Sequence, residues 1–441
     1  MKARNVMQPA ARATVLIAAL LAISCSGSGG GGGEPPTNRP PVAAFTATPE
    51  AGILPVTVSF DAAASTDPDG SITRYAWDFA DGSTAEGRTV QHTFVKAGGY
   101  DVRLTVTDNT GATSTASGTV IAASRVAATR YTVAEIPTLG ADFYAAPQAI
   151  NNKGQVTGYA QFDGSGAVHA FLYSGGVSRD LGTLGGLESY GRDLNDAGEV
   201  VGVSDTANGR SHGFVYRNGT MTDLGTLGGF HSDAAAINKA GQVAGTAEDG
   251  TGVYRAFLFD KGQMTAIGDL GGQYSNAEAI NDKGEIAGMS TTADGREHVY
   301  LYHAGVLDDL GAGLPGSGVS VRSMNSATDI VGMWVPPAGF VGYTGFLYRS
   351  GVMSSLSSGY TEPTSINMAG VVVGYAHFGN VGAAFVWDDV KGLQNLNDLM
   401  DPAPGWTLVV AEDINDRGQI VGFGHRAGLT DVAILLTPVY E

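Results

Sequence analysis

Cysteine and charge are both scarce in this sequence of 441 residues. Only one cysteine, Cys25, is present, so the chain can form neither an intrachain disulfide nor a zinc site built on several cysteines. Charged residues make up 15% of the chain, and 25 Lys and Arg face 43 Asp and Glu, which leaves a net charge of −18. A surface of this sign repels phosphate groups, and we therefore expect no nucleic-acid partner.

Glycine, by contrast, is abundant. The 65 glycines are about twice the usual share of roughly 7%, and they show no Gly-X-Y period of the collagen type. Hydrophobic residues reach 43% of the chain, with 17 Tyr and 16 Phe, which is enough apolar surface for several cores. The composition predicts a folded protein of about two to four domains in which glycine marks turns.

The N-terminal segment has the pattern of an export signal. Basic residues between Lys2 and Arg12 precede an apolar run from Ala13 to Ile23, which is shorter than the roughly 20 residues of a membrane-spanning helix. The run ends in Ala22-Ile23-Ser24-Cys25, which resembles the signal of bacterial lipoproteins. This resemblance implies that residues 1–24 are a signal peptide and that Cys25 is the lipidated first residue of the mature protein. An ordinary secretory signal with a chance cysteine is the alternative.

Residues 25–41 then follow as a tether. The segment contains five consecutive glycines and two Pro-Pro pairs, a composition typical of a flexible spacer that stiffens toward its end. Ser26, directly after the cysteine, resembles the sorting signal of outer-membrane lipoproteins in Gram-negative bacteria. We therefore expect the protein to be anchored at the cell surface, in the outer membrane, through its N-terminal lipid.

Residues 42–122 show short alternating strands separated by turn residues, which is typical of a small antiparallel β-sandwich. Three motifs resemble those of PKD domains: Ala64 to Gly70 (Ala-Ser-Thr-Asp-Pro-Asp-Gly), Tyr75 to Gly82 (Tyr-Ala-Trp-Asp-Phe-Ala-Asp-Gly) and Gly99 to Asp108. The resemblance implies an Ig-like fold and a role as an extracellular spacer or interaction module. We expect Trp77 to anchor the core between the two sheets.

Asp61, Asp67 and Asp69 allow two interpretations. Hard cations such as Ca²⁺ bind several oxygen ligands, and the Asp-Pro-Asp-Gly loop brings two carboxylates close together. Asp and Gly are also favoured in tight turns, and no Glu follows at the spacing of a calcium-binding loop. We therefore favour turns over calcium here and expect no other metal or cofactor.

A repeat organises residues 131–441. An asparagine preceded by Ile, Leu or Met recurs every 42 to 48 residues, at Asn151, Asn195, Asn238, Asn281, Asn325, Asn367 and Asn415. Each has a glycine seven positions later, at Gly158, Gly202, Gly245, Gly288, Gly332, Gly374 and Gly422. In six repeats the asparagine opens an Asn-x-x-Gly turn, which Thr328 breaks in the fifth. A period in the forties without a helical pattern is typical of propeller blades or of a solenoid.

Each repeat divides into four short strands, the number in one propeller blade. The last repeat stops after its third strand, Val432 to Pro438, whereas Tyr131 to Gly140, ahead of the first repeat, has the pattern of a fourth strand. We therefore predict an all-β protein in which a linker at 123–130 joins the sandwich to a seven-bladed β-propeller at 131–441 that its N-terminal strand closes. An open solenoid is the alternative.

The repeats also resemble the extracellular HAF-repeat family, named for a His-Ala-Phe triplet. His169-Ala170-Phe171 matches the triplet, and Asp180 to Gly186 (Asp-Leu-Gly-Thr-Leu-Gly-Gly) matches the second half of the pattern. The resemblance implies an exported bacterial protein and says little about activity. His169, His212 and His298 fall on third strands of different blades, too far apart to share a metal ion. We expect each to be hydrogen-bonded within or between blades.

Positions that vary between repeats are the candidates for function, because the recurring positions build the blade. Three residues before each asparagine, on the strand nearest the channel, are Gln148, Arg192, Ala235, Glu278, Arg322, Thr364 and Glu412. Just ahead of this strand come Tyr190, His231, Tyr274, Tyr360 and Trp406. The four charged members of the first set and all of the second are our candidate ligand-binding residues, with a solvated rim as the alternative.

Mixed charges and aromatic rings suit an extracellular polysaccharide or a protein, so we expect a monomeric binding or adhesion module. The sequence contains no Ser-His-Asp signature, Gly-x-Ser-x-Gly elbow, His-Glu-x-x-His pair or nucleotide fingerprint, and therefore indicates no catalytic residue. The alternative function is a carbohydrate-active enzyme, a glycan lyase or hydrolase with two carboxylates at the channel mouth.

The export signal predicts that membrane attachment depends on one thiol. Cys25→Ser removes the acceptor for the lipid, so the protein should move from the detergent phase to the aqueous phase in a detergent partition assay of whole cells. Retention of the variant in the detergent phase contradicts the lipoprotein assignment.

Overall fold

The computed structural model describes residues 38–137, 145–161, 166–311, 318–334, 342–401, 405–426 and 429–440, together with the two-residue strand Ile17–Ala18. The chain divides into two compact units, Met1–Ser124 and Arg125–Glu441. Strands dominate both, and no helix in the described part of the chain is long and apolar enough to cross a membrane. Cys25, the tether up to residue 37 and residues 138–140 of the expected closing strand lie outside the described residues.

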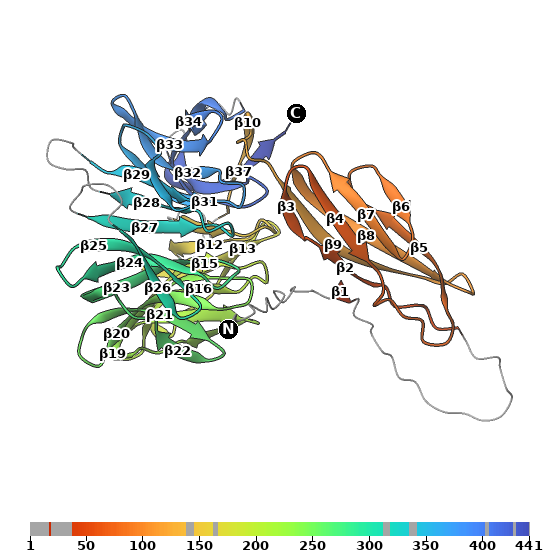
Figure 1. Ribbon diagram of the computed structural model, residues 1–441, viewed down its shortest axis with the longest axis horizontal. Helices are drawn as coiled ribbons and strands as arrows, with labels where there is room; N and C mark the ends of the chain where they lie inside the picture. Colours follow the sequence, from red (N-terminus) through yellow and green to blue (C-terminus); the bar gives the residue numbers. More distant parts are fainter. Residues whose placement is uncertain are drawn as a thin grey trace, which may run out of the picture. The chain divides into compact units, whose positions relative to one another are not determined.

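The first unit is a β-sandwich (Figure 1). One sheet consists, in spatial order, of β1 (Ile17–Ala18), β2 (Ala44–Thr48), β4 (Val56–Asp61) and β7 (Thr89–Phe94). The other consists of β3 (Ala51–Ile53), β9 (Thr113–Ala123), β8 (Gly98–Asp108), β5 (Ile72–Asp78) and β6 (Thr84–Glu86). The rings of Phe45 and Phe60 lie 5.1 and 5.4 Å from that of Trp77 across the core. Trp77 is therefore the core anchor that the sequence predicted.

The described residues of the second unit form seven antiparallel sheets of four strands each. From the inner strand outward, the first three are β11 (Ala145–Ile150), β12 (Val156–Gln161), β13 (Val168–Ser174), β14 (Val177–Asp180); β15 (Gly185–Leu194), β16 (Val200–Thr206), β17 (Ser211–Arg217), β18 (Thr220–Asp223); and β19 (Gly228–Ile237), β20 (Val243–Asp249), β21 (Tyr254–Asp260), β22 (Gln263–Ala266).

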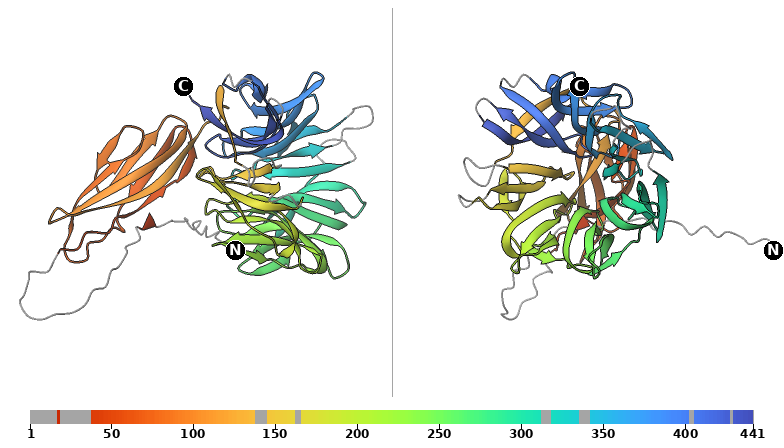
Figure 2. Two further views of the ribbon diagram at one scale, coloured as in Figure 1. Left: turned by 180° about the vertical axis from the view of Figure 1, so that it is seen from behind. Right: turned by 90° about the vertical axis from the view of Figure 1, so that its left-hand side faces the viewer.

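The next three sheets are β23 (Gly271–Ile280), β24 (Ile286–Thr292), β25 (Glu297–His303), β26 (Val306–Gly311); β27 (Val319–Met324), β28 (Ile330–Trp334), β29 (Thr344–Arg349), β30 (Val352–Ser355); and β31 (Thr361–Ile366), β32 (Val372–Phe378), β33 (Val381–Asp388), β34 (Gly392–Asn395). A single 3-10 turn, η1 (Leu396–Asp398), follows β34. The right-hand view of Figure 2 shows the sheets arranged in sequence order around a central axis, as the blades of a propeller.

Aromatic side chains on the third strands fill the spaces between blades. Phe171, Phe214, Phe257, Phe346 and Phe385 are at most 2% exposed. Phe214, for example, packs in one cluster with Ala149 and Ala170 of the preceding blade. The sequence places apolar residues at both faces of each blade because neighbouring blades cover both faces.

The seventh sheet joins the two ends of the propeller unit. It consists of β35 (Trp406–Ile414), β36 (Ile420–Arg426), β37 (Leu429–Val439) and, as its outer strand, β10 (Arg130–Glu135), which lies beside β37 in Figure 1. The register runs from Arg130 opposite Val439 to Glu135 opposite Ile434. Tyr131 of β10 is only 1% exposed. The predicted closure by the N-terminal strand is confirmed.

A ring of asparagine side chains links all seven blades. The Nδ2 of each repeat asparagine donates to the backbone carbonyl of the corresponding asparagine in the next blade, at 2.9 to 3.5 Å, and Asn415 closes the ring onto Asn151. These side chains are only 3% to 5% exposed. We call the set Asn151, Asn195, Asn238, Asn281, Asn325, Asn367 and Asn415 the asparagine ring.

Each asparagine also holds its own turn. The Oδ1 of Asn238 accepts from the backbone N–H of Ala240 and of Gln242, at 3.1 and 3.0 Å. Thr328 does not break the turn of the fifth repeat, contrary to the sequence expectation: its N–H donates to the Asn325 carbonyl at 3.0 Å, and its φ of 70° is the one that glycine adopts elsewhere. The Thr328 hydroxyl is engaged as well, because it donates to Glu285 Oε2 of the preceding blade at 2.6 Å.

Closure by β10 predicts the result of two truncations. Removal of residues 1–142 deletes β10 and exposes the edge of β37, with the loss of cross-strand hydrogen bonds worth about 1 kcal/mol each and of the burial of Tyr131. Amide hydrogen exchange at residues 432–438 should therefore accelerate. Removal of residues 1–125 spares β10 and serves as the control, with exchange nearly unchanged. Unchanged protection in the longer truncation contradicts a ring locked by β10.

The asparagine ring predicts that replacement of a single ring asparagine strongly destabilises the propeller. Asn238→Ala removes the acceptor of the Ala240 and Gln242 N–H groups and one donor to the Asn281 carbonyl, which keeps its bond from the Gly284 N–H. Since one hydrogen bond contributes about 1 kcal/mol, the loss of these three should lower the propeller transition by roughly 6 °C in calorimetry. Substitution of the exposed Gln263 by Ala is the control and should shift the transition by less than about 1 °C. Equal effects of the two substitutions would refute a structural role for the ring.

Candidate functional site

A β-bulge gives every inner strand the same local shape. The pairing between first and second strands skips one residue in each blade, namely Gln148, Arg192, Ala235, Glu278, Arg322, Thr364 and Glu412. These are the seven variable positions that the sequence analysis selected. A bulge re-aims the side chain of the extra residue, and all seven residues line the central channel.

The repeat glycine makes room for this bulge. A Cβ atom at Gly245 would lie 2.1 Å from the carbonyl oxygen of Asp233, and one at Gly288 would lie 2.0 Å from that of Asn276. The other five repeat glycines face an inner-strand carbonyl in the same way, at 1.9 to 2.1 Å. No other amino acid fits in that space, so the glycine and the bulge occur together in every blade.

The channel brings together the charged candidates. It has a volume of about 310 Å³, and its lining includes Arg192, Glu278, Arg322 and Glu412. Burial raises the pKa of Glu278 and of Glu412 to about 7, although the positive charge of Arg322 acts to lower both values. Arg322 therefore interacts electrostatically with two carboxyl groups, that of Glu278 on β23 and that of Glu412 on β35.

A second cavity continues from the channel at the end away from the asparagine turns. It has a volume of about 720 Å³. We call it the mouth pocket; its polar and aromatic lining includes Arg192, His231, Asp233, Tyr254, Tyr274, Asn276, Glu278 and Arg322. Five of the nine candidate residues, Arg192, His231, Tyr274, Glu278 and Arg322, thus line one cavity. Glu412 lines the channel only.

Opposite charges lie side by side in the mouth pocket. Arg192 Nη2 lies 3.1 Å from Asp233 Oδ2, while Asp233 Oδ1 is buried without a hydrogen-bond partner. Glu278 Oε1 accepts a hydrogen bond from Asn276 Nδ2 at 2.6 Å. With two arginines and two carboxyl groups, the pocket is nearly balanced in charge, and its acceptor and donor groups point into a shared space.

Two further channel carboxyl groups have structural roles. Asp193 Oδ2 accepts from the N–H of Ile237 in the next blade at 2.8 Å, and Asp413 Oδ2 accepts from the N–H of Ile150 at 2.7 Å. Burial raises the pKa of both, that of Asp193 to about 7. Because their oxygens satisfy backbone groups of neighbouring blades, we assign these residues to blade contacts and not to ligand binding.

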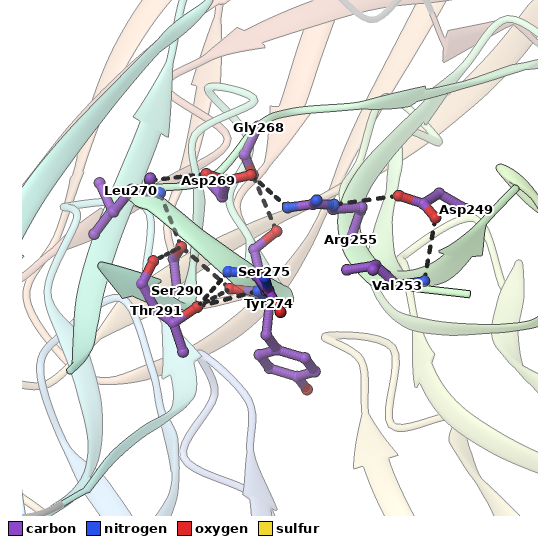
Figure 3. A network of polar contacts seen from close by, with 12 residues as sticks. Asp249, Val253, Arg255, Gly268, Asp269, Leu270, Tyr274, Ser275, Ser290 and Thr291 are labelled. Atoms are coloured by element: carbon purple, nitrogen blue, oxygen red, sulfur yellow. Dashed lines mark hydrogen bonds and ion pairs between the residues drawn. The ribbon is translucent and has the colours of Figure 1, made fainter. Parts of the chain in front are cut away.

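Polar contacts between blades position Tyr274 at the pocket (Figure 3). Ser275 Oγ donates to the Gly268 carbonyl and accepts from the N–H of Ala256 in the preceding blade, both at 3.0 Å. The N–H of Tyr274 donates to Thr291 Oγ1 at 3.1 Å. The Tyr274 ring points away from this network in Figure 3 and contributes to the pocket lining.

Three candidates lie outside both cavities. The Tyr190 hydroxyl donates to Glu188 Oε2 at 2.7 Å, and its ring packs against Tyr159 at 4.9 Å. Tyr360 stacks on His377, with 4.5 Å between ring centroids. The guanidinium of Arg426 lies 5.4 Å from the centre of the Trp406 ring. The structure does not bring these three residues together with the other six.

The lining residues of the mouth pocket that sequence analysis missed include Asp233, Asn276 and Tyr254. Asp233 and Asn276 precede the bulge residues of their blades by two positions, and residues two apart on a strand share a face. That spacing could have identified both. Tyr254 begins a third strand, β21, and nothing in the repeat marks it.

The three repeat histidines are hydrogen-bonded within their own blades, as the sequence predicted. His169 Nδ1 lies 3.1 Å from Asp180 of the same blade, and His212 and His298 pair with aspartates in the same way. Asp61 Oδ1 accepts from the Ala63 N–H within a turn. Among the described residues, no group of three or more His, Cys, Asp or Glu side chains is arranged to hold a metal ion.

Residues 38–122 match the family model of the PKD domain. A microbial collagenase of Vibrio alginolyticus is 40% identical over 85 residues, which are 19% of this chain and 10% of the collagenase. The chain thus spans about a tenth of that relative. The solved PKD1 domain of Vibrio anguillarum Epp is 36% identical and covers 19% of this chain and 95% of its own, with a TM-score of 0.18.

The second unit is similar to a solved β-propeller at low sequence identity. The β-propeller domain of the Trilobed protease from Pyrococcus furiosus is 8% identical and covers 67% of this chain and 93% of its own length, with a TM-score of 0.48. Residues 38–122 are a PKD domain, and a seven-bladed β-propeller follows them.

Proposed function

We propose that this protein binds an extracellular polysaccharide in the mouth pocket of its propeller. The observation that carries the proposal is the convergence of charged bulge residues from three blades, Arg192, Glu278 and Arg322, with aromatic side chains in one cavity. Cavities of about 300–1,000 Å³ are typical of small-ligand sites, and the mouth pocket falls in this range. A cavity of this size suits a few sugar rings better than the broad, flat contact of a protein partner.

The chemistry of the lining supports a sugar ligand. Pyranose rings present hydroxyl groups at their edges and C–H groups on their faces. Arg192, Asp233 and Asn276 offer hydrogen-bond donors and acceptors, while Tyr254 and Tyr274 offer ring faces. A protein ligand remains the second outcome of the binding test.

Two exposed apolar side chains lie on β15 and β19, the inner strands that also carry the pocket residues Arg192 and His231. Leu187 and Phe230 follow the Gly-Gly pair of successive repeats, and their exposed fractions are 74% and 53%. The guanidinium of Arg210 lies 4.2 Å from the centre of the Phe230 ring and holds it in place. Exposed rings beside a polar cavity are a feature of binding faces, because they lengthen the contact with an extended ligand.

The other parts of the chain suit a surface role in this proposal. Lipid on Cys25 and the tether of residues 26–41 attach the protein to the outer membrane, and the PKD domain extends the binding unit from it.

Two substitutions in the pocket test this function. Arg192→Ala removes a donor and frees Asp233, and Tyr274→Ala removes a ring face. On a panel of neutral and acidic polysaccharides in affinity electrophoresis, each variant should bind at least about 10-fold more weakly than the unchanged protein, which corresponds to roughly 1.4 kcal/mol.

The matched control is Lys261→Ala. Lys261 lies in the turn between β21 and β22, at the face of the asparagine turns, and its side chain is 90% exposed. This variant should bind as the unchanged protein does. Absence of binding to every polysaccharide, or equal loss in the control, contradicts the proposal.

A further inference from the structure

The mouth pocket contains two carboxyl groups on adjacent blades. Asp233 belongs to β19 and Glu278 to β23, and both line the same cavity. The negative charge of Asp233 acts on Glu278, so the two groups interact across the pocket. Two carboxyl groups that flank a bound glycan are the common requirement for hydrolysis of a glycosidic bond.

We infer that the mouth pocket hydrolyses the glycan that it binds, with Glu278 as general acid and Asp233 as general base. The inference rests on the proposed function, because only a glycan seated in this pocket places a glycosidic bond between the two groups. It also goes beyond that function, since a pocket that only binds needs neither carboxyl group in a defined protonation state.

The two groups have different partners in the pocket. Asp233 Oδ2 is paired with the guanidinium of Arg192, which belongs to the neighbouring blade, at 3.1 Å. Its Oδ1 is buried without a hydrogen-bond partner. Buried polar atoms are nearly always paired, so this oxygen is an unmet acceptor that a water or a sugar hydroxyl would satisfy.

Glu278 is more deeply buried than Asp233 and has no salt-bridge partner among the described residues. Burial raises its pKa to about 7, so that a large fraction carries a proton near neutral pH. Asn276 Nδ2 donates to Oε1, which leaves Oε2 as the oxygen that carries the proton. The charged and titratable groups that act on Glu278 are Arg192, Asp233, Tyr274, Tyr300 and Arg322. The two arginines lower its pKa, and the charge of Asp233 raises it.

The reaction needs only water as co-reactant. Oε2 of Glu278 donates its proton to the glycosidic oxygen, and the bond between that oxygen and the anomeric carbon breaks with the electron pair on the oxygen. A water oxygen forms the new bond to the anomeric carbon, and its proton passes to Asp233. The products are two shorter glycans, one with a new reducing end. Exchange with solvent then returns the proton to Glu278 and removes that of Asp233.

The test measures new reducing ends from starch, xylan, mannan, pectin and alginate, using the full chain. The inference predicts product from at least one polysaccharide that binds, with a rate that falls above about pH 7 as Glu278 loses its proton. Glu278→Gln and Asp233→Asn should each lower kcat/KM by roughly 100-fold or more while binding is retained. A merely structural role would not produce the pH limb near 7.

The control variant is Asp308→Asn. Asp308 lies on the outer strand β26, where its 52% exposed side chain pairs with His303, and it should keep full activity and the same pH profile. Binding without product from any of the polysaccharides overturns the catalytic inference and leaves the binding function intact. Absence of binding overturns both. Full activity of Glu278→Gln shows that the acid has been wrongly assigned.

Discussion

The asparagine ring is the contact on which the rest of the propeller depends. Seven buried side-chain amides connect the inner turns of adjacent blades, and the bond from Asn415 to the Asn151 carbonyl closes the circle at 2.9 Å. Each Oδ1 also accepts two backbone N–H groups of its own turn, as in Asn238. Loss of one amide therefore removes an inter-blade hydrogen bond and two hydrogen bonds within the turn at the same time. By fixing the spacing of the inner strands, the ring sets the width of the channel and decides which side chains meet there.

Within each blade, the recurring residues build the fold and the variable residues determine the chemistry of the channel. A carbonyl oxygen of the inner strand lies about 2 Å from where a Cβ atom of the repeat glycine would be, so only glycine fits opposite the bulge. The bulge in turn directs its extra residue toward the channel. A recurring residue can be replaced by another type if the new side chain keeps a similar contact. In the third blade, Arg255 stands at the position of the repeat histidine and pairs with Asp269 and Asp249. The bulge residue faces the channel, and its chemistry changes from blade to blade.

Part of the site was predictable because one strand position has the same orientation in every blade. The period alone selected Arg192, Glu278 and Arg322, and the structure places all three at the mouth pocket. The aromatic candidates were less predictable. His231 and Tyr360 both stand seven positions before the repeat asparagine. His231 nevertheless lies within β19 and lines the pocket, whereas Tyr360 precedes β31 and stacks on His377. Which surface such a ring packs against depends on side chains from other strands, and the repeat pattern does not specify those side chains.

The amino-acid sequence by itself determined the all-β class, the number of blades and the strand that closes them. These follow from local rules, since a buried turn amide and a glycine opposite a bulge are needed once in each blade and therefore recur at a fixed period. Only the tertiary structure decided that Asp233 and Glu278, 45 positions apart, line one cavity, and that Tyr254 joins them from a third strand. Whether these side chains line one cavity depends on the curvature of the propeller and on the packing of each side chain. The spacing of the repeat specifies neither.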